Sequence, residues 1–115
     1  MSERNILFLL EDIKESIENI LSFTKGLSFD MYCADMKTVH AVQHNFMIIG
    51  EAVARITDDY KQQYEQINWR QIKDFRNVIV HDYFGIDCSI VWDIIRFRLP
   101  DLLISITNLI ATGSE

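Results

Sequence analysis

The sequence predicts an all-α fold, an antiparallel bundle of four to five helices joined by short connections. Apolar residues recur three and four positions apart through most of the chain, and the strict alternation typical of half-buried strands is almost absent. Only one proline and four glycines interrupt this pattern. The 115 residues, 49% of them hydrophobic, correspond to one domain over residues 1–115 with a single core.

The first helix is expected from Glu3 to Lys25, with Ser2 as its N-cap and Gly26 as the residue that ends it. Its apolar residues alternate three and four apart and so form one stripe, which we expect to be buried. The residues of this stripe are Ile6, Leu10, Ile13, Ile17 and Ile20.

The second helix is expected over residues 36–56, after Asp35 as a capping residue. The preceding stretch LSFDMYCAD reads as a loop or a ragged helix start. The following stretch TDDYKQQYEQIN is polar and reads as a connection with a short helical turn. The inward-facing residues of the second helix should be Val39, Val42, Phe46, Ile49 and Val53.

The third helix is expected over residues 69–83. Asn68 is suited to cap its beginning, and Gly85 follows as a stop signal. Two aromatic residues of this helix, Trp69 and Phe75, are expected to pack in the core, as is Phe84 beyond it.

The last helix is expected over residues 88–111, with Asp87 as its cap. Pro100 lies inside it and removes one backbone donor, so we expect a kink near Arg96. Its apolar residues are Val91, Ile94, Ile95, Leu99, Leu102, Leu103 and Ile106.

The composition indicates a soluble, cytoplasmic protein that does not associate with membranes. The apolar runs are too short to span a bilayer, and acidic residues come too early for a signal peptide. Cys33 and Cys88 lie far apart in no pairing or metal-binding pattern, so they are interpreted as reduced and structural. A net charge of −6 argues against a general nucleic-acid coat, but it leaves room for a local basic pocket.

The first and last helices carry more apolar residues than one stripe needs. Leu7, Leu9 and Leu21 lie off the main seam of the first helix, and Trp92 and Phe97 flank that of the last. A single bundle of this length would leave some of this surface exposed. We therefore expect self-association, most simply as a twofold homodimer.

The stretch RNVIVHDY at residues 76–83 concentrates reactive side chains. Arginine offers a planar fork of donors that matches phosphate oxygens, and histidine can accept or donate a proton near neutral pH. At 100° per residue, Tyr83 points within about 20° of Arg76, but His81 lies about 140° away. Arg76 and His81 can therefore meet only if the helix end bends or if a second copy faces the first.

RNVIVHDY matches the R-x-x-x-x-H-x-Y signature of the HEPN superfamily, in its HepT-like toxin branch. The stretches IIGEA at 48–52, INWRQIKDFRN before the motif and FGIDCSIVWDII after it also resemble this family. The resemblance implies an all-α dimer that acts as a metal-independent endoribonuclease, needs no cofactor and cleaves RNA through its 2′-hydroxyl. In this interpretation, the protein would be the toxin of a type VII HepT/MntA-like toxin–antitoxin system.

The resemblance also implies roles for individual residues. Arg76 and His81 would be catalytic. Apart from the resemblance, Asn77, Asp82 and Glu51 are candidate supporting residues by their type and position. Tyr83 would be modified with AMP by a partner nucleotidyltransferase antitoxin of the MntA type. The phosphate of this AMP would bind Arg76 and repel the RNA backbone. The local charge near the motif is only +1, because Arg70, Lys73 and Arg76 face Asp74 and Asp82, so RNA affinity should be low and salt-sensitive.

Each of these residues also has a structural interpretation. Arg76 could form a salt bridge with Asp74, Glu51 or a carboxylate of the second copy, and Glu51 could instead lie at the wet edge of its helix. His81 could cap a helix C-terminus, and Tyr83 could simply pack. Asn77 and Asp82 could be solvated or help to end the helix.

Two further alternatives concern metals and catalysis. His40 and His44 have a spacing that can hold zinc, but no third ligand follows at a recognisable position, so an ordinary polar helix face is favoured. The alternative function is a non-catalytic helical dimer that binds a nucleotidyltransferase or presents a nucleotide to it.

Overall fold

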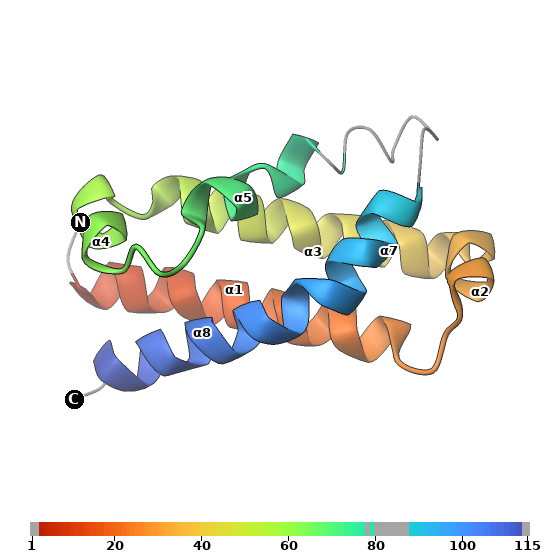
Figure 1. The fold of residues 1–115 in the computed structure, drawn as a ribbon, viewed down its shortest axis with the longest axis horizontal. Coiled ribbons are helices and arrows are strands. Elements are labelled where there is room, and N and C mark those ends of the chain that lie inside the picture. The colour runs from red at the N-terminus through yellow and green to blue at the C-terminus, as the bar shows by residue number, and fades with distance from the viewer. Residues whose placement is uncertain (1–2, 78, 80–87, 114–115) are drawn as a thin grey trace.

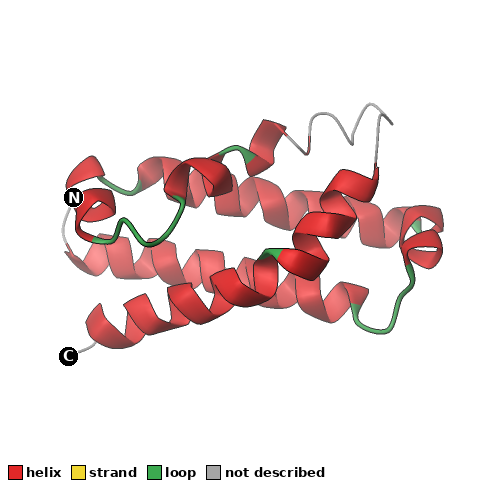
Figure 2. Cartoon of the chain, in the orientation of Figure 1, coloured by secondary structure: helices red, strands yellow, loops and turns green. Residues whose placement is uncertain are grey.

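The computed structural model describes residues 3–77, 79 and 88–113, and this part of the chain is helical and contains no strand (Figure 2). The predicted all-α fold is therefore confirmed. The helices for which both ends are described are α1 (Glu3–Thr24), α2 (Phe29–Ala34), α3 (Met36–Arg55), α4 (Asp58–Gln63), α5 (Trp69–Lys73), α7 (Cys88–Phe97) and α8 (Leu99–Gly113).

The two longest helices, α1 and α3, run antiparallel and make the most extensive contact in the molecule (Figure 1). Helix α8 packs against α1, and α5 packs against α3. The short helix α2 lies at one end of the bundle, whereas α4 lies at the other end, near the start of α1 (Figure 1). No helix in the described ranges is both long and apolar enough to cross a membrane.

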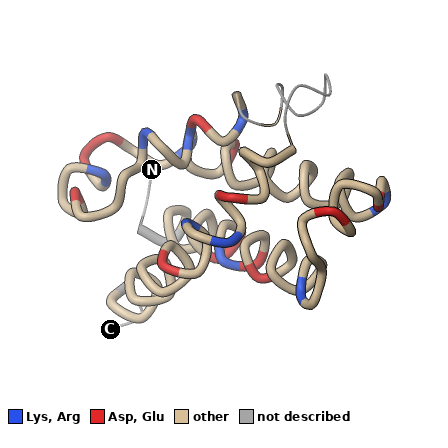
Figure 3. The backbone as a smooth tube through the Cα atoms, turned by 45° about the vertical axis from the view of Figure 1, so that its right-hand side comes forward, with Lys and Arg blue, Asp and Glu red and all other residues tan. Residues whose placement is uncertain are grey.

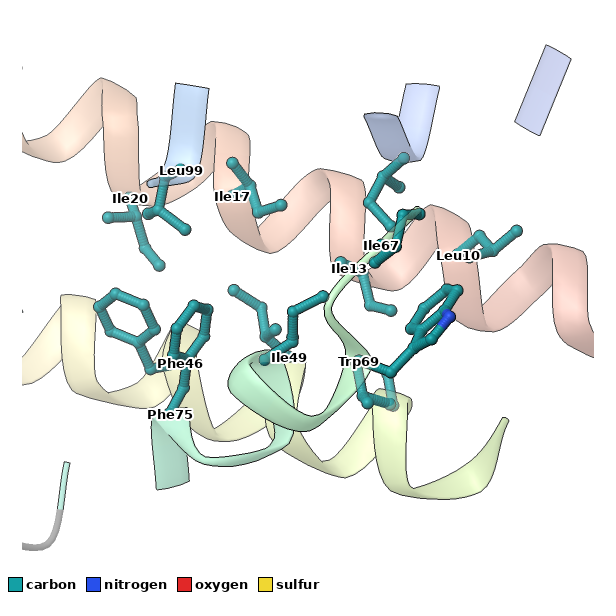
Figure 4. Close-up of a cluster of buried hydrophobic side chains, with 14 of the residues drawn as sticks. Leu10, Ile13, Ile17, Ile20, Phe46, Ile49, Ile67, Trp69, Phe75 and Leu99 are labelled. Carbon is teal, nitrogen blue, oxygen red and sulfur yellow. The ribbon is translucent and has the colours of Figure 1, made fainter. Parts of the chain in front are cut away.

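The core lies between α1, α3, α5 and the α7–α8 pair. The stripes predicted for the first two long helices are buried throughout, and side chains from α1, α3 and α5 converge in Figure 4. Leu99, at the start of α8, is completely buried among them. Of the seven apolar residues named for the last helix, four are buried, namely Val91, Ile95, Leu99 and Ile106. The other three, Ile94, Leu102 and Leu103, are half-buried against the same core.

Capping residues set several helix ends where the sequence predicts them. The Asp35 side chain accepts a hydrogen bond from the Thr38 backbone N–H, and Asn68 does the same for the Gln71 N–H. Gly26 follows α1 with a φ of 79°, a left-handed conformation that favours glycine. Ser2, Gly85 and Asp87, which were expected to bound other helices, lie outside the described residues.

The stretch LSFDMYCAD was expected as a loop or a ragged helix start, and it instead forms the separate helix α2. The Ser28 side chain accepts a hydrogen bond from the Met31 N–H, which satisfies one of the free donors of the first turn. Tyr32 of α2 is fully buried against the core. The short helical turn expected after α3 is confirmed as α4, with Thr57 as its N-cap.

The third helix is not continuous as predicted, because a turn interrupts it at Asp74 between α5 and the helical residues 75–77. Trp69, Ile72 and Phe75 face the core at intervals of three. Residues spaced by three drift about 60° per step around an ideal α-helix. The tight turn, in which the Asn77 N–H donates to the Asp74 carbonyl at 2.9 Å, keeps Phe75 on the inward side.

The last helical stretch is broken into α7 and α8 at Arg98, two residues beyond the kink expected near Arg96. Pro100 is the physical cause, because it has no N–H to donate to the carbonyl four residues earlier. Hydrogen bonds on both sides of the break persist: the Arg98 N–H donates to the Ile94 carbonyl, and the Leu102 N–H donates to the Arg98 carbonyl.

The prediction that the two cysteines are reduced is wrong: Cys33 and Cys88 form a disulfide. They are 55 residues apart in sequence, but the packing of α2 against α7 brings their Cα atoms within 6.5 Å. This separation lies in the range that a disulfide spans without backbone movement. The cysteines therefore no longer support the cytoplasmic assignment, which stays a prediction.

The apolar surplus on the outer helices is only partly exposed. Leu9, expected off the seam, is buried, and Leu7, Leu21 and Trp92 are half-buried. Phe97 is 73% exposed, as expected, and other large apolar side chains are also exposed, among them Phe8, Ile90 and Ile104. The homodimer that this surface suggested stays a prediction.

Candidate active site

Buried aromatic contacts fix the backbone that leads into the R-x-x-x-x-H-x-Y motif. Phe75, the residue before Arg76, is 3% exposed, and its ring meets that of Phe46 on α3 edge-on at 5.3 Å. At the start of α5, the Trp69 indole N–H donates to the Tyr64 carbonyl at 3.1 Å. These contacts hold the residues on either side of α5, so the position of Arg76 relative to α3 is well defined.

Gly50 on α3 provides the surface on which the Arg76 side chain lies. A β-carbon at Gly50 would overlap Arg76 Cγ and would stand 2.7 Å from Arg76 Cδ. Gly50 is four residues after Phe46, so the two lie on the same face of α3. One turn of this face therefore receives Phe75, and the next turn receives the methylene groups of Arg76.

Glu51, the next residue on α3, forms an ion pair with Arg76. The distance from Arg76 Nη2 to Glu51 Oε1 is 2.8 Å, and the two side chains are 42% and 56% exposed, respectively. Of the partners considered from the sequence, Glu51 is thus the one that the structure brings to Arg76. Since both side chains are exposed, the pair adds about 0–1 kcal/mol to stability, and its main effect is on orientation.

The other predicted site residues are only partly described. Asn77 is helical and exposed, one residue after Arg76. His81, Asp82 and Tyr83 lie outside the described residues, as does Phe84. That His81 and Tyr83 act together with Arg76 therefore stays a prediction.

The charge around the described part of the motif is mixed. Arg70, Lys73 and Asp74 are exposed in or next to α5. Basic and acidic positions are interspersed along the described helices (Figure 3). Arg96 lies over the Trp92 ring, with 5.7 Å from its guanidinium carbon to the ring centroid. Within the described residues, α5 therefore adds no strong basic patch to the weak positive charge that the sequence predicts near the motif.

An aromatic cluster supports the beginning of α5. The Tyr60 ring lies 4.7 Å from that of Tyr64 and 6.2 Å from that of Trp69. Burial raises the pKa of the Tyr60 hydroxyl, with a smaller contribution from the neighbouring Tyr64. Tyr60 therefore stays neutral at physiological pH and serves as a packing residue.

His40 and His44 are both exposed on α3. Within the described ranges, no three His, Cys, Asp or Glu side chains are grouped so that they could hold a metal ion.

Comparison with known proteins places the motif in a family. The family described as ribonuclease HepT-like matches residues 13–109. The chain belongs to the HepT-like ribonucleases. It is 34% identical over 110 residues to a Methanocaldococcus jannaschii protein named "Putative RNase MJ0127", which covers 96% of this chain and 91% of that protein. No solved structure gave a significant match.

A second HepT-like relative is more similar over a shorter stretch. It is the "Probable ribonuclease HepT" of Thermococcus cleftensis, 39% identical over 93 residues that cover 81% of this chain and 84% of the relative. The resemblance read from the sequence, and with it the ribonuclease class, is confirmed.

Sequence reasoning did not identify the contact between Gly50 and Arg76. The available signal was the Gly-Glu pair inside the apolar run IIGEAV, where neither residue suits the middle of a buried helix face. In the structure Gly50 contacts the methylene groups of Arg76, and Glu51 forms an ion pair with its guanidinium.

Proposed function

We propose that this HepT-like ribonuclease is a metal-independent endoribonuclease toxin that cleaves RNA through the 2′-hydroxyl next to the scissile phosphate. The observation that carries the proposal is the arginine of the motif, which Gly50 and Glu51 hold at the surface of α3. The Arg76 guanidinium has five N–H donors, and its salt bridge with Glu51 runs through Nη2. The remaining donors can bind a phosphate.

The proposed reaction divides the chemistry between two residues. Arg76 binds the scissile phosphate and stabilises the negative charge that builds on it. His81 accepts the proton of the attacking 2′-hydroxyl and gives a proton to the leaving 5′-oxygen. The products are a 2′,3′-cyclic phosphate and a 5′-hydroxyl. Asn77 and Asp82 are supporting residues beside Arg76 and His81.

Glu51 is a positioning residue in this proposal. Glu51 orients Arg76 before the substrate binds. The RNA phosphate then binds the Arg76 guanidinium either together with Glu51 or in its place. Glu51→Gln keeps the size of the side chain but removes the charge that orients Arg76 and repels phosphate. We expect kcat to fall by about tenfold without a rise in KM, because loss of orientation affects the transition state.

A dimer and a partner protein complete the proposal. In a twofold homodimer, the motifs of the two copies would line one cleft and bring Arg76 and His81 to one phosphodiester. A nucleotidyltransferase antitoxin of the MntA type would attach AMP to Tyr83 and so neutralise the toxin, as in a type VII toxin–antitoxin system in the cytoplasm. The added phosphate would compete with RNA for Arg76.

The test of the enzyme is cleavage of total cellular RNA by the purified chain in the presence of a chelator, followed by analysis of the product ends. We expect cyclic phosphates, and rates lowered by about 10²-fold or more in Arg76→Ala and His81→Ala. Arg70→Ala is the control, because it removes an exposed arginine of α5 that lies outside the motif. Absence of cleavage by the unmodified protein would support the non-catalytic binding partner instead.

The test of regulation is the intact mass of the chain produced with and without the nucleotidyltransferase. We expect mass increments of AMP units only in its presence, mapped to Tyr83 and absent from Tyr83→Phe. Unchanged mass with an active nucleotidyltransferase would contradict this part of the proposal.

A further inference from the structure

The Cys33–Cys88 disulfide joins α2 to α7. Cys33 is in α2, which directly precedes α3, and Cys88 is the first residue of α7. Both cysteines are half-buried. A thiol reagent from solvent can therefore reach the bond without unfolding of the core.

A second contact holds α7 one turn beyond the disulfide. Trp92 is four residues after Cys88, on the same face of the helix. Its ring lies 5.3 Å from that of Tyr32 and 6.3 Å from that of Phe29, both in α2. Without the disulfide, α7 would stay docked through Trp92, but its first turn would lose its covalent attachment.

The residues on either side of the rest of the motif, Arg76 and Cys88, are attached to α3 and α2, respectively. At its beginning, Arg76 is held by Gly50 and Glu51 in the second half of α3. At its end, Cys88 is bonded to Cys33, three residues before α3 begins. His81 and Tyr83 belong to residues 77–87, between these two attachment points. The covalent bond therefore fixes Cys88, the residue that follows this stretch in the sequence.

We propose that the Cys33–Cys88 disulfide is a redox switch of the ribonuclease, more active when the bond is formed. This inference rests on the proposed function. A protein or small-molecule dithiol reduces the bond by two successive thiol–disulfide exchanges. The sulfur–sulfur bond of the chain breaks and takes up two electrons and two protons to give two thiols. The dithiol is oxidised to its own disulfide, and a disulfide oxidant reverses the reaction.

The physical effect is on the fraction of molecules in which the motif is correctly arranged. We expect the bond at Cys88 to raise the fraction of molecules in which His81 meets the phosphate, because a covalent cross-link restricts the chain beside it. Reduction is expected to lower kcat by roughly three- to tenfold, in proportion to the competent fraction. The KM for RNA should change less, because Gly50 and Glu51 hold Arg76 independently of the disulfide.

The experiment measures the disulfide and the activity in the same samples. The full-length chain is equilibrated in mixtures of reduced and oxidised dithiothreitol, and the remaining disulfide is quantified by alkylation and intact mass. RNA cleavage is then followed at a temperature well below the unfolding transition of the reduced protein. A purely structural disulfide would change thermal stability but would leave kcat at this temperature unchanged.

We expect kcat to fall in parallel with the disulfide fraction. The double variant Cys33→Ser/Cys88→Ser should have the low rate of the reduced protein in every buffer, with an unchanged helical circular dichroism spectrum. Constant kcat across a complete reduction, or thiols that never pair, would overturn the switch alone. No cleavage in any redox state would overturn the proposed ribonuclease and the switch together.

Discussion

The substitution Gly50→Ala tests the arrangement of Arg76 more directly than removal of the arginine, because it leaves every group of the proposed site in the chain. The added methyl group occupies the space in which the Arg76 side chain lies on α3. Arg76 must move, and its ion pair with Glu51 is then weakened or lost. We expect a large loss of ribonuclease activity with little change in stability.

The magnitude follows from the contact distances. The new β-carbon would overlap Arg76 Cγ and stand 2.7 Å from Arg76 Cδ, whereas carbon atoms in contact are about 3.5–4.0 Å apart, so the side chain must move by at least about 1 Å. A displacement of this size at a reacting group can lower the rate by about 10²-fold. The free energy of unfolding gains about 1 kcal/mol from helix propensity and loses about 0–1 kcal/mol with the exposed ion pair.

The assay compares kcat/KM for RNA cleavage with urea-induced unfolding of the same protein. We expect kcat/KM to fall by about 10²-fold, while the free energy of unfolding stays within about 1 kcal/mol of wild type. Ala54→Gly, at an exposed position one turn along α3, is the matched control: it should lower stability by about 1 kcal/mol and leave activity unchanged. Activity of Gly50→Ala within twofold of wild type would refute the reasoning.

Three further predictions concern stability. Reducing the disulfide should lower the free energy of unfolding by about 4 kcal/mol, because the bond closes a loop with a sequence separation of 55; equal urea midpoints with and without dithiothreitol would contradict this. Asn45→Ala should destabilise the chain by about 1–3 kcal/mol in thermal unfolding, because Asn45 is 5% exposed and accepts a hydrogen bond from the Asn19 amide at 3.2 Å. The hydrogen bonds from Thr38 lower the pKa of Asp35, so its carboxylate stabilises the folded state above about pH 4, and this contribution is lost as the pH falls through the lowered pKa. Asp35→Asn should flatten this part of the acid unfolding curve, and an unchanged curve would argue against the assignment.

The long helices could be predicted because local signals determine them. The apolar stripe of α1, the left-handed Gly26 and the capping side chain of Asp35 all act within a few residues of their own position. The separate helix α2 and the break at Asp74 could not be predicted in the same way. Both exist because an aromatic residue, Tyr32 or Phe75, reaches the core only if the chain turns there.

The sequence by itself determined the helical class, the approximate bounds of α1 and α3 and, through the complete R-x-x-x-x-H-x-Y motif, the ribonuclease family. Only the tertiary structure decided which carboxylate pairs with Arg76 and that Cys33 pairs with Cys88. Helix periods and capping residues depend on neighbours within one or two turns, which the sequence displays directly. Glu51 is 25 positions from Arg76, and Cys33 is 55 positions from Cys88. Only the packing of the helices brings the members of each pair together.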